Sequence, residues 1–168
     1  MFVKKLEKMR RILIPTDFTI DSLQLVEYAI LNFPDTKLDI VLIAGYRLPD
    51  TRWGITHFSE REQIREQLSD KFKDAKRRIV LEHKKNIETV SFELFTGVNS
   101  FAFQNFLEQM NSVDAVVPKK KALHCPNNKW FDTTEFIKNN VKNVIEAPVE
   151  LTEKPTEKKF SLISLFNL

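Results

Sequence analysis

The residues that could bind a ligand fall into two short segments, Pro15-Thr16-Asp17 and the run from 118 to 126, which reads PKKKALHCP. The carboxylate of Asp17 could hold a ligand hydroxyl, or it could cap the turn into a following helix. Lys119–Lys121 could hold an anion, because a lysine binds phosphate as a flexible point charge. The alternative for these lysines is an ordinary solvated loop.

His124 and Cys125 are adjacent in the second segment, which raises the question of a zinc site or a nucleophilic cysteine. A zinc site needs three or four ligands at recognisable spacing. The other two histidines, His57 and His83, have no motif around them. We therefore expect neither metal binding nor cysteine catalysis.

Strands and helices are expected to alternate along the chain. The run 12–14 before Pro15 and the run 38–44 (LDIVLIA) are almost wholly apolar, which is typical of central strands covered on both faces. Residues 88–95 alternate between apolar and polar, so this strand is expected at an edge. The pattern predicts further strands at 113–117 and 148–151, and helices at 19–33, 59–79, 100–110 and 132–143.

This alternation predicts an α/β fold: a three-layer, doubly wound, parallel five-stranded sheet with the strand order 3-2-1-4-5. Ligands of such sheets bind beyond the carboxyl ends of the strands where the order reverses, here between the first and fourth strands. Trp130-Phe131 could stack on a base there or pack against the sheet. The predicted ligand-binding residues are Pro15, Thr16, Asp17, Ala44, Gly45, Val117, Pro118, Lys119, Lys120, Lys121 and Thr133.

Three segments together resemble the universal stress protein family. They are RILIPTDFTIDSLQLVEYAI from residue 11, DAVVPKKK from residue 114 and VIEAPVEL from residue 144. The resemblance spans about residues 11–152 and implies an adenine-nucleotide-hydrolase-like fold, a role in the stress response and dimerisation through the fifth strand. In nucleotide-binding members the aspartate after the first strand contacts the adenosine, and by position that residue is Asp17.

The glycine-rich phosphate loop of that family is missing here. The family pattern after the fourth strand is G-x-x-G followed by Gly-Ser, whereas this chain has no glycine after Gly97. Glycine allows left-handed backbone and a close approach of N–H groups to phosphate, and Pro118 and Pro126 remove two donors. Asp132 and Glu135 have the spacing of a capping box, which would occupy the helix start. We therefore expect no cofactor, with ATP or AMP as the alternative.

Length and composition are those of one globular domain. The 168 residues carry a net charge of +3, too small to argue for nucleic acid. A single cysteine excludes an intramolecular disulfide and suits a reducing compartment, and no apolar run approaches the roughly 20 residues of a membrane-spanning helix. We expect a cytoplasmic protein that binds neither nucleic acid nor membrane. The expected organisation is an N-terminal extension (1–10), a universal-stress-protein-like domain (11–152) and a linker with an apolar tail (153–168).

The apolar tail could dock on its own domain, on a partner subunit or on another protein. The sequence thus favours a non-catalytic stress-response module that forms a homodimer and contacts an unidentified protein. A nucleotide- or anion-binding sensor using Asp17 and Lys119–Lys121 is the alternative. A receiver domain is rejected, because Thr96-Gly97 stands where its phosphoacceptor aspartate would be. The predicted tail contacts are Phe160, Leu162, Ile163, Leu165 and Phe166.

Overall fold

A parallel sheet forms the centre of the domain in the computed structural model, which describes residues 9–120 and 123–148. The main strands lie in the order β3-β2-β1-β4-β6, with a short strand β5 paired to β2. This order matches the prediction once β6 is taken as the fifth main strand. The bounds are Met9–Pro15 for β1, Lys37–Tyr46 for β2, Ile87–Phe95 for β3, Asp114–Pro118 for β4, Trp130–Phe131 for β5 and Asn143–Ala147 for β6.

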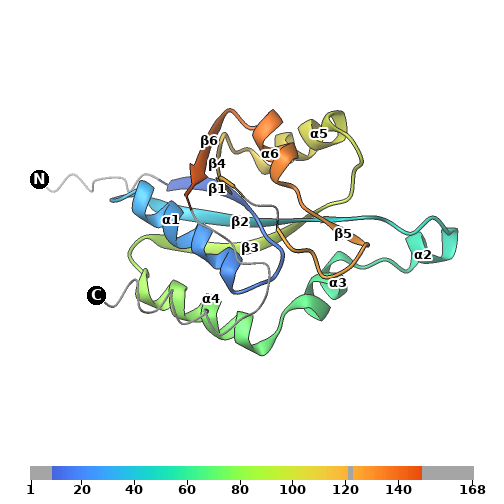
Figure 1. The fold of residues 1–168 in the computed structure, drawn as a ribbon, viewed down its shortest axis with the longest axis horizontal. Coiled ribbons are helices and arrows are strands. Elements are labelled where there is room, and N and C mark those ends of the chain that lie inside the picture. The colour runs from blue at the N-terminus through green and yellow to red at the C-terminus, as the bar shows by residue number, and fades with distance from the viewer. Residues whose placement is uncertain (1–8, 121–122, 149–168) are drawn as a thin grey trace, which may run out of the picture.

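Helices cover both faces of the sheet, as the three-layer prediction requires (Figure 1). Successive residues of a strand point to opposite faces, and the two cores divide accordingly. On one face Ile12 and Ile40 pack with α1 (Gln24–Asn32) and α4 (Asp70–Glu82). The opposite core includes Leu13 and Val41 from the strands and Phe103 and Ile137 from the helices. Phe103 belongs to α5 (Ser100–Met110) and Ile137 to α6 (Thr134–Asn140).

The sheet positions agree with the hydropathy of the strands. β1 and β2 are central and their middle residues are buried, while β3 pairs only with β2 among the described strands and has exposed residues along its length. β6 is the other edge, paired to β4 in parallel from Asn143 to Ala147. The predicted edge strand at 88–95 is therefore confirmed.

Three predictions about the first half need correction. The long helix predicted from 59 to 79 is two helices, α3 (Glu60–Gln67) and α4, because Leu68 has extended backbone and Ser69 caps a new start by accepting from the Phe72 N–H. Residues predicted as a loop contain the short helix α2 (Arg52–Thr56). The helix predicted from 19 begins as a 3-10 turn at Asp21–Leu23.

The last third also differs from the prediction. The fifth main strand is Asn143–Ala147, earlier than the predicted 148–151, because α6 already ends at Asn140. Only Pro148 of the predicted strand lies within the described residues. The whole of the apolar tail 160–168 lies outside them. β5 is antiparallel to β2 and was not predicted. In the part of the chain that the structure describes, no helix has the length and apolar character to cross a membrane.

Candidate functional site

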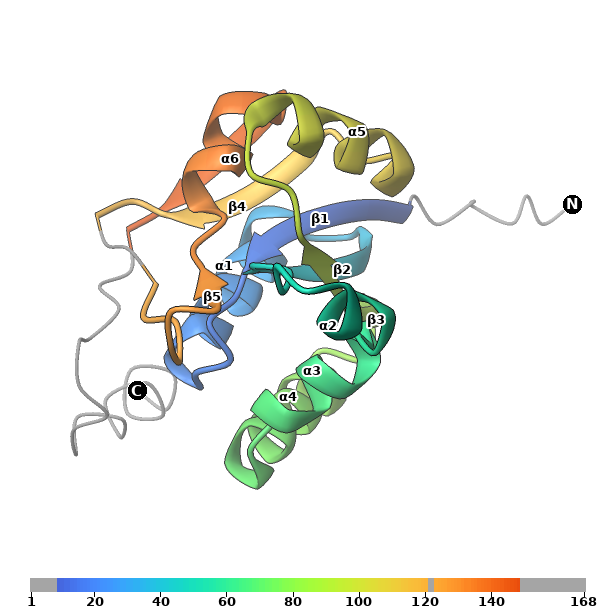
Figure 2. The ribbon, with the colours of Figure 1, turned by 90° about the vertical axis from the view of Figure 1, so that its right-hand side faces the viewer.

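The predicted site lies at the switch point, meaning the edge of the sheet beyond the carboxyl ends of β1 and β4. Figure 2 looks toward this end, where the chain between β4 and α6 runs past the ends of β1 and β2. The carbonyl oxygen of Ile43 accepts two hydrogen bonds in this region. It accepts a hydrogen bond from the Thr16 N–H at 2.9 Å and another from the Thr133 hydroxyl at 3.3 Å. Thr16 and Thr133, both predicted site residues, are thus buried and bonded to the end of β2.

Asp17 is bonded on both carboxylate oxygens by its own chain. Oδ1 accepts from the N–H and the hydroxyl of Thr19 at 3.0 and 2.5 Å, which is the turn-capping role that the sequence suggested. Oδ2 accepts from the backbone N–H of His124 at 2.9 Å, across 107 residues of sequence. Only 5% of Asp17 is exposed. The residue expected to meet a ligand therefore holds the loop that follows β4.

Asp132 makes a matching set of bonds at the other end of this loop. Its Oδ2 accepts from the Leu123 N–H at 2.9 Å, and its Oδ1 accepts from the N–H and hydroxyl of Thr134 at 2.8 and 2.6 Å. The predicted capping box with Glu135 is wrong in detail, because Thr133 is the N-cap and makes no side-chain capping bond. The Asp132 carboxylate nevertheless occupies an N–H at the start of α6, as expected.

Aromatic rings pack beside these bonds. Phe18, directly after Asp17, adopts left-handed backbone with φ of 64°, a conformation that costs a residue with a Cβ roughly 1–2 kcal/mol. Its ring is buried against Trp130 at 5.0 Å between centroids and against Phe92 at 5.9 Å. Burial of a large apolar side chain contributes roughly 1.5–3 kcal/mol, enough to offset the backbone cost. The packing alternative for Trp130 is the one observed.

Gly45 is predicted as a site residue, and its missing side chain makes room for β5. A Cβ built on Gly45 would lie 2.4 Å from a ring carbon of Phe131, so the ring lies directly over the backbone. Gly45 pairs with Phe131 in the sheet, and the Arg47 guanidinium lies 5.3 Å from the ring centroid. The Phe131 ring therefore fills the space above the end of β2.

The remaining predicted residues divide into buried and exposed ones. Pro15, Ala44, Val117 and Pro118 are buried in the sheet. Lys119 and Lys120 are exposed, and the backbone N–H of Lys119 donates to the carbonyl of Ala147 at 2.9 Å, extending the β4–β6 pairing. Lys121 lies outside the described residues.

The thiol of Cys125 is not activated by its surroundings. Burial, followed by the nearby charges of Asp132 and Asp17, raises the pKa of the Cys125 thiol to about 12. A thiol with such a pKa is almost wholly protonated at neutral pH and is a poor nucleophile. Within residues 9–120 and 123–148, no group of three or more His, Cys, Asp or Glu side chains could hold a metal ion.

Sequence reasoning missed Phe18 and Leu123 in this region, and it named Trp130 and Asp132 without predicting their full set of contacts. Phe18, Leu123, Trp130 and Asp132 supply the rings, the apolar cover and the second carboxylate. A signal was present in the sequence: Phe18 and Leu123 are large apolar residues inside the two predicted ligand segments, and such residues are usually buried. Asp132 was considered only as a partner of Glu135.

Comparison with known proteins adds structural likenesses but no family. No family model and no curated protein matches the chain. A hypothetical protein, PH0823, is 16% identical over 84% of this chain and 99% of its own, with a TM-score of 0.46. A universal stress family protein from Burkholderia pseudomallei is 10% identical over 83% and 96%, with a TM-score of 0.42. Protein Rv1636 from Mycobacterium tuberculosis H37Rv is 17% identical over 86% and 100%, with a TM-score of 0.39. None of these likenesses gives a residue of this chain a role.

Proposed function

We propose that this chain is a non-catalytic, universal-stress-protein-like module that acts in a stress response through protein contacts, with little binding of ATP. The proposal combines the strand order, the three sequence segments that resemble the family and the state of the switch point. The cytoplasm is the compartment that we propose, since the single cysteine needs no oxidising environment.

The observation that carries the proposal is the hydrogen bond from the His124 N–H to Asp17 Oδ2. A nucleotide that took the place of His124 on this oxygen of Asp17 would break the bond and leave a part-buried N–H to find another partner. An unsatisfied buried group costs roughly 1–3 kcal/mol. The same holds for Leu123 and Asp132, whose bond lies one residue away along the loop. Ligand binding at this place therefore starts with a penalty from both bonds.

The backbone donors of the loop support the same conclusion. Phosphate loops bind anions with free N–H groups, but here the N–H groups of Lys119, Leu123 and His124 are used inside the protein. The charged side chains of the loop that could still hold an anion include the exposed Lys119 and Lys120. These two exposed lysines are the observation that favours the alternative, an anion-binding sensor.

Nucleotide titration separates the two functions. ATP, AMP and cyclic nucleotides are added to millimolar concentration, and heat and melting temperature are recorded for the wild type and for Lys119→Ala/Lys120→Ala. The matched control is Lys84→Ala/Lys85→Ala, an exposed lysine pair at the other end of the domain, near the start of β3. We expect no heat and no shift in any variant. Micromolar binding that only the 119/120 pair weakens would establish the sensor instead.

Dimerisation and the tail are tested separately. Residues 160–168 are deleted and the molar mass and the free energy of unfolding are measured by light scattering and denaturant titration. A tail that docks on its own domain or on a partner subunit predicts a lower stability or a lower mass. An unchanged protein would exclude both kinds of docking.

A further inference from the structure

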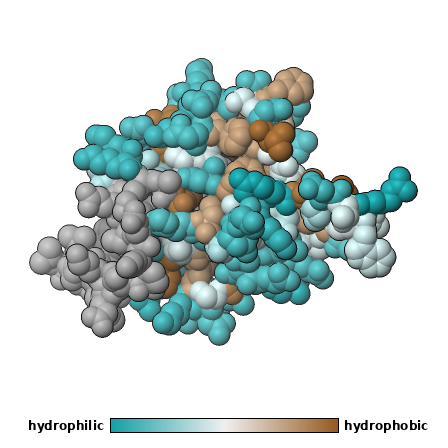
Figure 3. Space-filling model, turned by 45° about the vertical axis from the view of Figure 1, so that its right-hand side comes forward, coloured by the Kyte–Doolittle hydropathy of each residue, from teal (hydrophilic) through white to brown (hydrophobic). Residues whose placement is uncertain are grey.

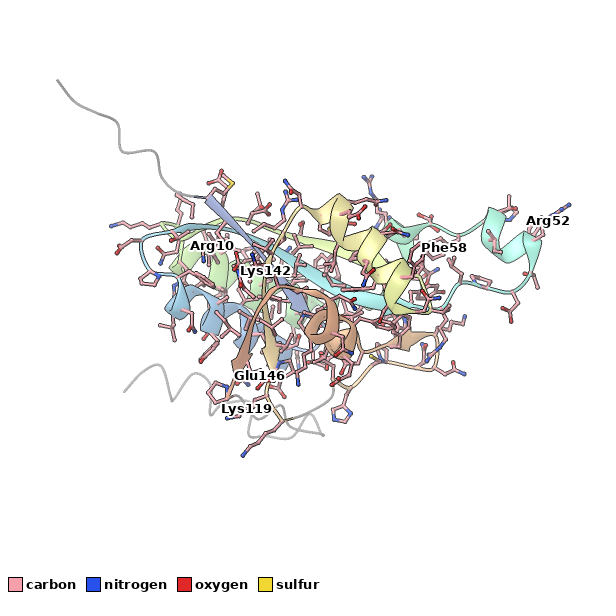
Figure 4. The ribbon with its side chains drawn as sticks, turned by 90° about the horizontal axis from the view of Figure 1, so that it is seen from above. Arg10, Arg52, Phe58, Lys119, Lys142 and Glu146 are labelled. Carbon is pink, nitrogen blue, oxygen red and sulfur yellow. The ribbon has the colours of Figure 1, made fainter. Side chains whose placement is uncertain are left out.

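Residues 47–58 form an arm that extends past the end of the sheet between β2 and α3 (Figure 1). The helix α2 at its end reads RWGIT, and it exposes 74% of Trp53 and 52% of Ile55. Figure 4 shows Arg52 at the tip, pointing away from the body of the domain. Two large apolar side chains and one cation are thus presented to the surroundings.

The arm holds Trp53 in a defined arrangement although this side chain is not part of a core. The Thr51 hydroxyl caps α2 by accepting from the Gly54 N–H at 3.0 Å. The indole of Trp53 stacks on the His57 ring at 3.7 Å between centroids, and His57 Nδ1 lies 2.8 Å from the Trp53 carbonyl. A side chain ordered before binding loses less entropy on binding. Tryptophan and arginine are also the residues most often found to dominate binding energy at interfaces.

A groove lies between β3 and α5, on the edge of the sheet next to the arm. It encloses about 420 Å³ and is open to solvent. Figure 3 shows apolar side chains gathered over α5 beside the projecting arm. The lining is mixed: Ala102, Phe106 and Met110 supply apolar surface, while Glu60, Glu93, Asn105 and Gln109 supply polar groups.

The two carboxylates of the groove are placed close together. Glu60 accepts from the Leu94 N–H at 2.9 Å, which covers a backbone donor on the edge strand. Burial first, and then the neighbouring Glu60, raise the pKa of Glu93. The positive charge of Arg11 already acts against this rise in pKa, and a further cation beside Glu60 and Glu93 would favour their charged forms.

We propose that the arm of one copy of this protein enters the groove of a second copy, with Trp53 and Ile55 against the apolar lining and Arg52 beside Glu60 and Glu93. The charge of the arm helix is opposite to that of the groove, and both surfaces occur on every copy. A pair of copies related by a two-fold axis would make the contact twice. The occupant is therefore a second copy of this chain.

This inference names a contact surface for the protein contacts proposed above, and it is distinct from pairing along β6. Nucleotide titration does not report on it, so the proposed function and this contact can fail independently. Pairing along β6 would leave both the arm and the groove free.

Sedimentation equilibrium of the full chain tests the contact directly. We expect the wild type to self-associate, and Trp53→Ala to raise the dissociation constant at least about tenfold. Asn105→Lys/Gln109→Lys adds bulk and positive charge at two exposed groove positions on α5, and the same weakening is expected. Leu81→Ala removes an equally exposed apolar side chain on α4 and should change nothing.

Mixing the variants gives the sharpest result. Trp53→Ala keeps an intact groove and the lysine variant keeps an intact arm, so neither associates alone but an equimolar mixture can form one contact per pair. Acrylamide quenching follows the same event, since Trp53 is exposed whereas Trp130 is buried. We expect association to return in the mixture and the quenchable tryptophan to become protected. A monomeric wild type, a dimer that Trp53→Ala leaves intact, or a mixture without recovery would each overturn the proposal.

Discussion

The switch point and the β3–α5 groove lie at the same end of the sheet, but their carboxylates differ in how many hydrogen bonds they accept from the chain. At the switch point Asp17 and Asp132 accept hydrogen bonds from the N–H groups of Thr19, His124, Leu123 and Thr134. In the groove, Glu60 and Glu93 lie beside each other at a surface open to solvent. At the switch point, where sheets of this topology bind ligands, the carboxylates accept hydrogen bonds from the chain itself. In the groove, apolar surface and charge are exposed.

The difference shows that fold position alone does not identify a site. Sheets of this topology bind ligands at the switch point. In this protein the polar groups there already form hydrogen bonds with residues of the same chain. Groups that are already paired contribute little to binding, whereas a rigid exposed tryptophan and an open groove can still form contacts. Four substitutions break or sharpen this comparison.

The largest effect is expected from Asp17→Ala. It removes the acceptor of the Thr19 and His124 N–H groups in a buried setting, and hydrogen bonds to a charged group contribute about 1.5–3 kcal/mol each. We expect the free energy of unfolding to fall by about 3 kcal/mol or more in urea titration. Asp50→Ala, at an exposed position, is the control and should stay within about 0.5 kcal/mol. A loss no larger than that of the control would mean that the bonds do not hold the loop.

Gly45→Ala is expected to cost about 1–3 kcal/mol, because the new methyl group would meet the Phe131 ring at 2.4 Å. Thermal unfolding in the double variant Gly45→Ala/Phe131→Ala identifies the cause. If the ring clash is responsible, the combined loss is smaller than the sum of the two single losses. Simple additivity would contradict it.

Cys125 reports on the loop through its reactivity. Since its pKa is raised to about 12, thiolate is scarce at pH 8, and alkylation by iodoacetamide should be roughly a hundredfold slower in the folded than in the urea-unfolded protein. Asp132→Asn removes a charge that raises this pKa, so the folded rate should increase. Equal rates in the folded and unfolded wild type would show that Cys125 is not shielded.

The smallest effect is expected for Glu93 in the groove. Here we predict only the direction in which the stability of the folded protein changes with pH. Its pKa is raised in the folded state by burial and by Glu60, so the folded protein binds this proton more tightly than the unfolded chain does. Stability is therefore lost as the pH rises from the ordinary carboxyl pKa through the raised one. Glu93→Gln should remove that part of the slope in pH-dependent unfolding; an unchanged slope would refute the assignment.

The sequence predicted the sheet better than the site. Apolar runs such as 38–44 can only be buried, so the central strands and their order followed from hydropathy and connection rules. The break at Leu68 was missed although Ser69, which caps α4, is a local signal for a helix start. The strand β5 could not be read this way, because it depends on pairing with β2, which is distant in sequence. The same applies to the site: the bond between Asp17 and His124 joins residues 107 apart, and no local pattern indicates it.

Hydrogen exchange of the backbone amides of Leu123 and His124, followed by NMR with and without millimolar ATP, is the most direct test of the occupied switch point. We predict that both amides exchange slowly and that ATP changes neither their exchange rates nor their chemical shifts. Exchange at the rate of an unstructured peptide, or protection that develops only when ATP is added, would contradict the account.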